Sequence, residues 1–150
     1  MAAKGKLSPE QESQLRALFD RIMLTIDFSE SVGGFRTAAL PDMLRKSARQ
    51  ILDEGDLRDM RRMAREIDEA STFGLPPRHR EGLEAMLASR LGVDADAERA
   101  EMRAKAAAAI KRGKVGSEKE RRRLEDYAEM LEATGGDPEE IAAVRRLIGA

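Results

Sequence analysis

Apolar residues recur along most of the chain at intervals of three and four positions, a spacing that places them on one face of an α-helix. The pattern is strongest near the N-terminus, where Leu15, Phe19, Ile22 and Ile26 share a face. No segment shows the alternation of apolar and polar residues that a half-buried β-strand requires. The sequence therefore predicts an all-α fold, a compact bundle of amphipathic helices without a sheet.

Helix start and stop signals divide this pattern into about six to seven helices joined by short loops. A serine or aspartate before an apolar face can cap a helix, and proline fits the first turn, where its missing N–H is not needed. Glycine just beyond the last apolar position can end a helix in the left-handed conformation. The expected starts are Ser8-Pro9, Pro41, Asp56, Pro77, Asp94, Ser117 and Asp137, and the expected stops include Gly55, Gly92 and Gly135-Gly136.

The stretch FSESVGGFRTAA, residues 28 to 39, has no helical period and contains Gly33-Gly34, so it is expected to be a loop. Phe28 and Phe35 flank the two glycines. These rings either hold the loop against the core or form an exposed contact patch, and the sequence leaves both alternatives open.

The length of 150 residues is that of one domain. We expect residues 8–150 to form a single helical domain and residues 1–7 to be a disordered tail. A weak boundary at residues 92–95 separates a front half rich in Leu and Met from a back half dominated by charged residues.

The composition is that of a folded chain, because 41% of the residues are apolar although 37% are charged. The absence of cysteine excludes disulfides, thiolate zinc sites and a cysteine nucleophile, and is compatible with a reducing cytosol. No secretory signal and no apolar run of membrane-spanning length is visible, so the expected location is cytoplasmic, without a membrane partner. The preference for Ala, Arg and Glu resembles that of proteins from bacteria with GC-rich genomes.

A strongly basic segment covers residues 103–123, which contain nine basic and two acidic residues, a local charge of +7 in a chain of net charge −1. Such polarity within a neutral protein indicates an anionic partner, and a helix, a turn with glycine and a second helix resemble the helix-turn-helix arrangement of DNA-binding proteins. The candidate contacts to an anion or a nucleic acid are Lys111, Arg112, Lys114, Lys119, Arg121, Arg122 and Arg123.

A solvated surface held by ion pairs is the favoured interpretation of this segment. Acidic residues lie four positions from several of the arginines, a spacing at which opposite charges pair on a helix. Tyr127, the nearest aromatic residue, falls on the apolar face and is expected in the core, so it offers no platform for base stacking. The expected pairs are Glu118–Arg122, Arg122–Asp126 and Arg121–Glu125 in this segment, and Glu54–Arg58, Arg62–Glu66 and Arg65–Glu69 along a second basic stripe.

We identify no catalytic, cofactor-binding or metal-binding residue, and therefore expect no enzyme. His79 is the only histidine and lies between two arginines, as surface histidines often do. The motif GKVGS at residues 113–117 lacks the spacing and the preceding strand of a phosphate-binding loop. The acids of DADAE, residues 94–98, fit a helix cap better than a calcium loop, because the central Gly and the terminal Glu are missing.

These observations predict a non-enzymatic helical module that binds another protein or itself, with a homodimer as its simplest form. Eight methionines supply adaptable apolar contacts. The fifth helix presents an alanine face that buries little area, so a second chain could complete it: Ala97, Ala100, Ala104, Ala107 and Ala108. The alternative is a nucleic-acid-binding regulator that uses the basic segment 103–123.

Overall fold

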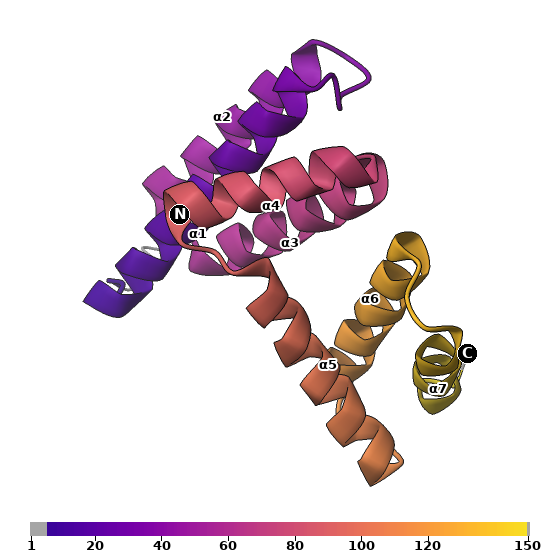
Figure 1. The fold of residues 1–150 in the computed structure, drawn as a ribbon. Helices are drawn as coiled ribbons and strands as arrows, with labels where there is room; N and C mark the ends of the chain where they lie inside the picture. Colours follow the sequence, from indigo (N-terminus) through magenta and orange to yellow (C-terminus); the bar gives the residue numbers. More distant parts are fainter. Residues whose placement is uncertain (1–5, 150) are drawn as a thin grey trace. The chain divides into compact units, whose positions relative to one another are not determined.

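A computed structural model of the protein describes residues 6–149, and within them the chain forms seven α-helices and no strand. The all-α prediction is confirmed. Figure 1 shows the helices in chain order. Their bounds are α1 Pro9–Ser31, α2 Ala39–Glu54, α3 Leu57–Gly74, α4 Pro77–Leu91, α5 Ala95–Arg112, α6 Glu118–Thr134 and α7 Pro138–Leu147.

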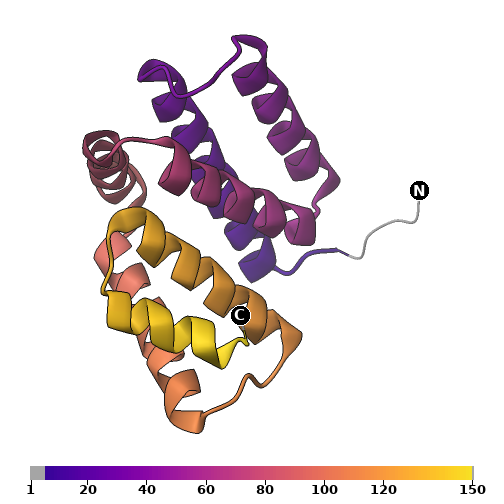
Figure 2. The same cartoon turned by 90° about the vertical axis from the view of Figure 1, so that its right-hand side faces the viewer.

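The chain divides between Val93 and Asp94 into two compact units, each with its own core. The first unit contains α1 to α4 and the second α5 to α7 (Figure 2). The division falls at the predicted boundary 92–95, inside the range predicted as one domain. Of the predicted tail, residues 1–5 lie outside the described residues, while Leu7 packs against the first core.

Most of the predicted helix ends are confirmed, because the capping side chains bond as their positions require. Ser8 and Gln11 form the reciprocal capping box, and Asp94 accepts a hydrogen bond from the Ala97 amide at 3.0 Å. Glycines in the left-handed conformation follow the last residues of several helices, among them Gly55, Gly92 and Gly135.

The first helix is longer than the sequence predicted, because it continues to Ser31 instead of ending before residue 28. Phe28 packs against the core between α1 and α4, and Ser29 is buried. This burial stabilises a helical turn that has no periodic pattern of its own. The second helix begins at Ala39, two residues before the predicted Pro41, which is buried in its first turn.

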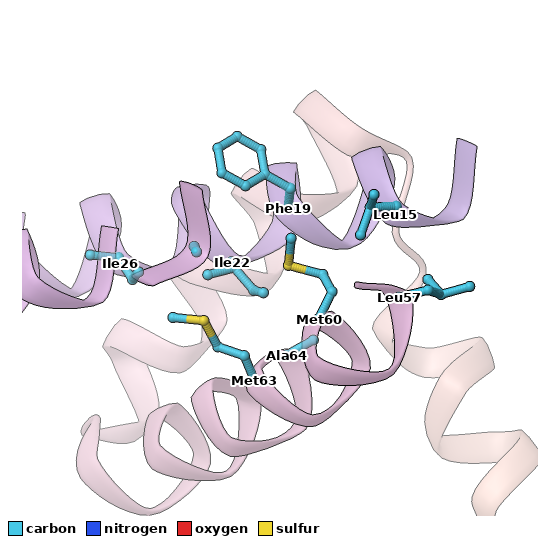
Figure 3. Packing of buried hydrophobic residues seen from close by; sticks show 9 residues of the cluster. Leu15, Phe19, Ile22, Ile26, Leu57, Met60, Met63 and Ala64 are labelled. Atoms are coloured by element: carbon cyan, nitrogen blue, oxygen red, sulfur yellow. The ribbon is translucent and has the colours of Figure 1, made fainter. Parts of the chain in front are cut away.

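The core of the first unit surrounds α1, which packs against α2, α3 and α4. Figure 3 shows Ile22 of α1 beside Met60 of α3, with Ile26 further along α1 on the side of Met63. Ile22, Ile26 and Met60 are almost fully buried. Complete burial of such a side chain contributes about 1.5–3 kcal/mol. α1 is therefore the central helix of this unit, as its strong apolar period predicts.

In the second unit α7 packs against both α5 and α6. The core of the second unit contains the large side chains of Leu124, Leu131 and Val144. Tyr127 also lies in this core, which confirms the position predicted for its ring. α5 contributes only small buried side chains, Ala106 and Ala109. Most of the apolar area buried in this core therefore comes from α6 and α7.

Candidate functional site

An apolar cleft of about 380 Å³ lies in the first unit, between α2 and α3. These two helices diverge from their connecting turn at Gly55, as both ribbon views show (Figures 1 and 2). Ile26 of α1 forms part of the floor, Leu44 of α2 part of one wall, and Met63 and Ile67 of α3 part of the other. The cleft is thus the space beside α1 that the diverging helices leave uncovered.

The loop between α1 and α2 also lines the cleft. Gly34 donates its amide to the Ser29 carbonyl at 2.7 Å, so the loop folds back onto the end of α1. A Cβ atom at Gly34 would lie only 3.0 Å from that oxygen. Phe35 is half-buried against the first core, so it holds the loop in place, as Phe28 does on the other side of the two glycines.

Large apolar side chains remain exposed around this cleft. Leu40 lines it and is 38% exposed, and Met43, three residues further along α2, is 63% exposed. Phe73 is 51% exposed in the last turn of α3, next to the lining residue Gly74. Large apolar side chains exposed on both helices beside an apolar cleft are typical of a site that binds a partner.

Two unpaired charges of opposite sign complete the lining. Arg36 in the loop and Glu66 on α3 are both exposed, and within residues 6–149 neither side chain has a hydrogen-bond or ion-pair partner. The predicted pair Arg62–Glu66 is wrong, because Arg62 instead pairs with Asp59 at 2.5 Å. Glu66 is thereby left free to meet a charge from outside.

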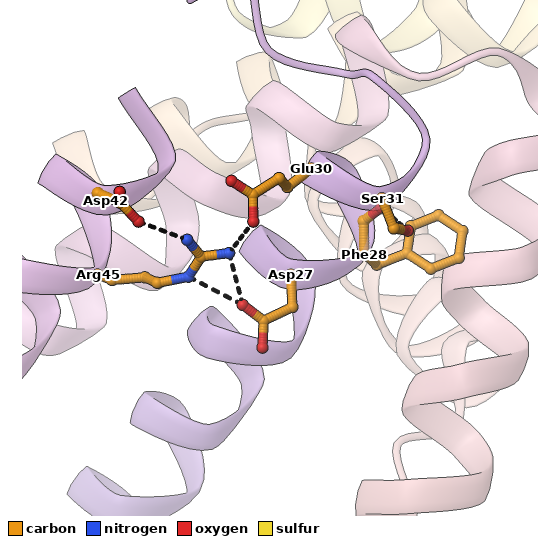
Figure 4. A network of polar contacts seen from close by, with 6 residues as sticks. All are labelled: Asp27, Phe28, Glu30, Ser31, Asp42 and Arg45. Atoms are coloured by element: carbon orange, nitrogen blue, oxygen red, sulfur yellow. Dashed lines mark hydrogen bonds and ion pairs between the residues drawn. The ribbon is translucent and has the colours of Figure 1, made fainter. Parts of the chain in front are cut away.

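An ion-pair network holds α2, which carries the lining residues Leu40 and Leu44, against α1 (Figure 4). The guanidinium of Arg45 donates to Glu30 at 2.5 Å, to Asp27 at 2.9 Å and to Asp42 at 2.8 Å. Hydrogen bonds to Glu30 and then to Asp27 hold the pKa of Arg45 above its ordinary value. The network links the end of α1 to the first turns of α2, and so fixes one wall of the cleft.

The sequence did not identify this site. Its exposed apolar residues fall on the same helical period as the core residues, so periodicity alone does not separate the two groups. The feature of the sequence that indicates this site is the width of the apolar face on α2. Leu40 and Met43 extend the stripe formed by Leu44, Ala48 and Ile51. When an apolar face is wider than the area that one neighbouring helix covers, part of it remains available to a partner.

The seven predicted basic contacts lie at the end of α5, in the following turn and on the first turns of α6. Two of these side chains form hydrogen bonds or ion pairs within the second unit. Arg112 bonds to Glu120, and Arg121 donates to the carbonyl of Ile148 while its guanidinium lies 3.7 Å from Glu118. Arg112 thus joins the end of α5 to α6, and Arg121 joins α6 to the residue that follows α7.

The other five are exposed and have no side-chain partner among the described residues: Lys111, Lys114, Lys119, Arg122 and Arg123. The pairs predicted between Arg122 and its acidic neighbours, and between Arg121 and Glu125, are not formed. The predicted start of α6 at Ser117 is confirmed, because Ser117 accepts from the Glu120 amide at 3.1 Å, while the Glu120 carboxylate accepts from the Gly116 amide at 2.7 Å. The basic segment is therefore less neutralised than the sequence predicted.

The described part of the chain also limits other kinds of site. No group of three or more histidine, aspartate or glutamate side chains within residues 6–149 is placed to hold a metal ion. Over the same range no helix has both the length and the apolar character needed to cross a bilayer. The alanine face of α5 is exposed, as Ala100, Ala104 and Ala108 show.

Comparison with known proteins identifies no relative: no protein-family model, no curated protein and no solved structure matches the chain. Any functional conclusion must therefore come from the surfaces described above.

Proposed function

We propose that this protein is a non-enzymatic interaction module that binds the apolar face of an amphipathic helix in the cleft between α2 and α3. The observation that carries the proposal is the apolar lining of the cleft, from Ile26 to the partly exposed Leu40, together with the exposed side chains of Met43 and Phe73 on the two helices that border it. Exposure of these side chains to water is unfavourable, and a partner's apolar face removes it.

The shape of the cleft supports a helical partner. Two helices that diverge over a third leave a groove in which a further helix can lie, and amphipathic helices bind such grooves through residues at positions i, i+3 or i+4, and i+7. Met43 and Met63 have flexible side chains that adapt to the partner's surface.

The polar groups of the cleft support binding more than catalysis. The hydroxyl of Thr25 donates to the Arg21 carbonyl at 2.8 Å, and that of Ser71 donates to the Ile67 carbonyl at 2.9 Å. Each bond lies within the helix that carries it, so neither hydroxyl has a base as its partner. A nucleophilic hydroxyl would need such a base beside it.

Selection from a displayed library of random peptides tests this proposal. We expect the full-length protein to enrich peptides with apolar residues at helical spacing, and Ala70→Glu to abolish their binding by placing a carboxylate in the cleft, where Ala70 is an exposed lining residue. Ala88→Glu is the matched control, an exposed alanine on α4 that should leave binding unchanged. Failure to enrich helical peptides, or equal binding by both variants, would contradict the proposal.

A second function, nucleic-acid binding through the basic segment, is favoured by the five unpaired basic side chains near the α5–α6 turn. Titration of a mixed-sequence DNA duplex and a single strand across salt concentrations tests it. For the duplex, five phosphate contacts predict a slope of the logarithm of the binding constant against that of salt between about −4 and −5. Replacing the five residues with glutamine should abolish binding, and no binding by the unmodified protein at low salt would exclude this function.

A cytoplasmic location remains part of the proposal. It is supported by the absence of cysteine, which fits a reducing compartment.

A further inference from the structure

The lining of the cleft is complementary to itself. In a dimer with two-fold symmetry the same surface of both copies forms the interface, so each contact from one residue to another occurs twice. The cleft has an apolar floor, exposed apolar side chains on both bordering helices, and one unpaired charge of each sign, Arg36 and Glu66. A surface with these three properties offers a second copy apolar area and a charge of each sign.

The charges favour a second copy over a strongly charged peptide. Arg36 and Glu66 together give the lining a net charge of zero, so a partner of one sign would satisfy one residue and repel the other. A second copy presents both signs at the same separation. The net charge of the whole chain is −1, so long-range repulsion between two copies is weak.

The apolar side chains agree with this assignment. Met43 on α2 and Phe73 on α3 are the two most exposed large apolar residues of the described chain. Both belong to helices that wall the cleft, so a second copy that covers the cleft lies close to both of them. Removing these groups from water provides the main driving force for association.

We propose that a second copy of this chain occupies the cleft, forming a two-fold dimer in which Arg36 of each copy pairs with Glu66 of the partner copy. The inference rests on the proposed function, because it names the partner of the same protein-binding surface. It also replaces the alanine face of α5 as the surface for self-association.

Charge reversal with sedimentation velocity tests the pairing. Arg36→Glu gives a chain with two acids in the cleft, and Glu66→Arg gives a chain with two bases, so each variant alone meets like charges twice. We expect the dimer dissociation constant of each variant to rise at least about tenfold, as expected for a loss of about 1.4 kcal/mol. An equimolar mixture of the two variants should dimerise with nearly the wild-type affinity, since every contact is then between opposite charges.

Matched controls separate this result from a general effect of charge. Arg49→Glu on α2 and Glu81→Arg on α4 reverse exposed charges that do not line the cleft, and should dimerise like the wild type. Far-UV circular dichroism confirms that each variant is folded. Ala104→Glu places a charge on the alanine face of α5 and should also leave the dimer intact.

Three outcomes overturn the inference. A dimer that dissociates with Ala104→Glu but not with Arg36→Glu forms through another surface. A mixture that stays monomeric excludes the Arg36–Glu66 pairing. A chain that is monomeric at every concentration but still selects helical peptides retains the proposed function without a second copy as partner, whereas a monomer that selects none contradicts both proposals.

Discussion

Tyr127 joins the helices of the second unit through its hydroxyl group. The ring is 3% exposed, and its hydroxyl donates to the Glu140 carboxylate at 2.9 Å. The Arg103 guanidinium lies 3.8 Å from the same carboxylate oxygen, so side chains from all three helices meet at one point. Burial, and then the hydrogen bond to Glu140, raise the pKa of Tyr127 above its ordinary value.

We expect Tyr127→Phe to destabilise the second unit by about 1.5–3 kcal/mol, because a hydrogen bond to a charged group is lost and Glu140 loses a partner. Urea unfolding followed by circular dichroism measures the change. Arg103→Gln is the control and should have a smaller effect, since Arg103 is exposed. Equal stability of Tyr127→Phe and the wild type would mean that water replaces the bond.

The raised pKa of Tyr127 predicts a loss of stability in alkali. The folded state holds the phenolic proton more tightly than the unfolded state, so this contribution is complete below pH 10 and disappears as the pH rises through the folded-state pKa. Tyr127 is the only tyrosine and tryptophan is absent, so tyrosinate absorbance reports this residue alone. Ionisation should begin at higher pH in the folded protein than in urea, and identical titrations would contradict the prediction.

Gly34 is required by the close return of the loop to the end of α1. A Cβ atom there would lie 3.0 Å from the Ser29 carbonyl oxygen and 3.2 Å from a methyl carbon of Leu75. Gly34→Ala should therefore destabilise the first unit by about 1–3 kcal/mol, as overpacking does.

Gly74 is the control for this prediction. At Gly74, also a lining residue, a Cβ atom meets nothing within 4 Å. Gly74→Ala should leave stability unchanged or raise it by up to about 1 kcal/mol, and thermal unfolding should show the difference between these variants.

At the scale of single elements, sequence patterns predicted the helices well because most of their ends depend on local bonds. Asp56, Asp94 and Asp137 cap the helices that they were expected to begin. The last turn of α1 was missed because it depends on contacts with residues distant in sequence, through Phe28 and the core of α4.

The candidate site was harder to predict because it depends on how elements diverge. Helical periodicity identifies the apolar face of α2, but the separation of α2 from α3 decides that Leu40 stays exposed while Leu44 is half-buried. The partner of Arg62 was also hard to predict from the sequence, which offers both Asp59 and Glu66. Both acids lie at helical spacing from the arginine, and side-chain geometry decides which of them pairs.

α5 depends on local helix stability in its first half, where no residue from Ala95 to Lys105 is buried. Asp94 caps this half through the Ala97 amide. We expect Asp94→Ala to speed amide hydrogen exchange over residues 95–105 about fivefold, because loss of a cap costs about 1 kcal/mol. Asp94→Asn keeps the acceptor oxygen and should behave like the wild type. If the alanine variant exchanges no faster, the cap does not stabilise this half of the helix.

The chain contains two cores of different construction. The first unit places a largely apolar helix face at its centre, with Ile22 and Ile26 almost completely buried. The second is smaller and receives only alanine from α5. Because small units bury a lower fraction of their surface, we expect the second unit to be the less stable.

Two core substitutions in the full-length chain test whether the units unfold separately. Ile22→Ala should destabilise the first unit and Leu124→Ala the second, each by about 2–5 kcal/mol. Circular dichroism follows both units, whereas fluorescence of Tyr127, the only tyrosine in a chain without tryptophan, follows the second unit alone. Ile22→Ala should therefore shift the dichroism curve and leave the fluorescence midpoint in place, while Leu124→Ala should shift both signals. If Ile22→Ala moved the fluorescence midpoint as far as the dichroism midpoint, the two units would unfold as one.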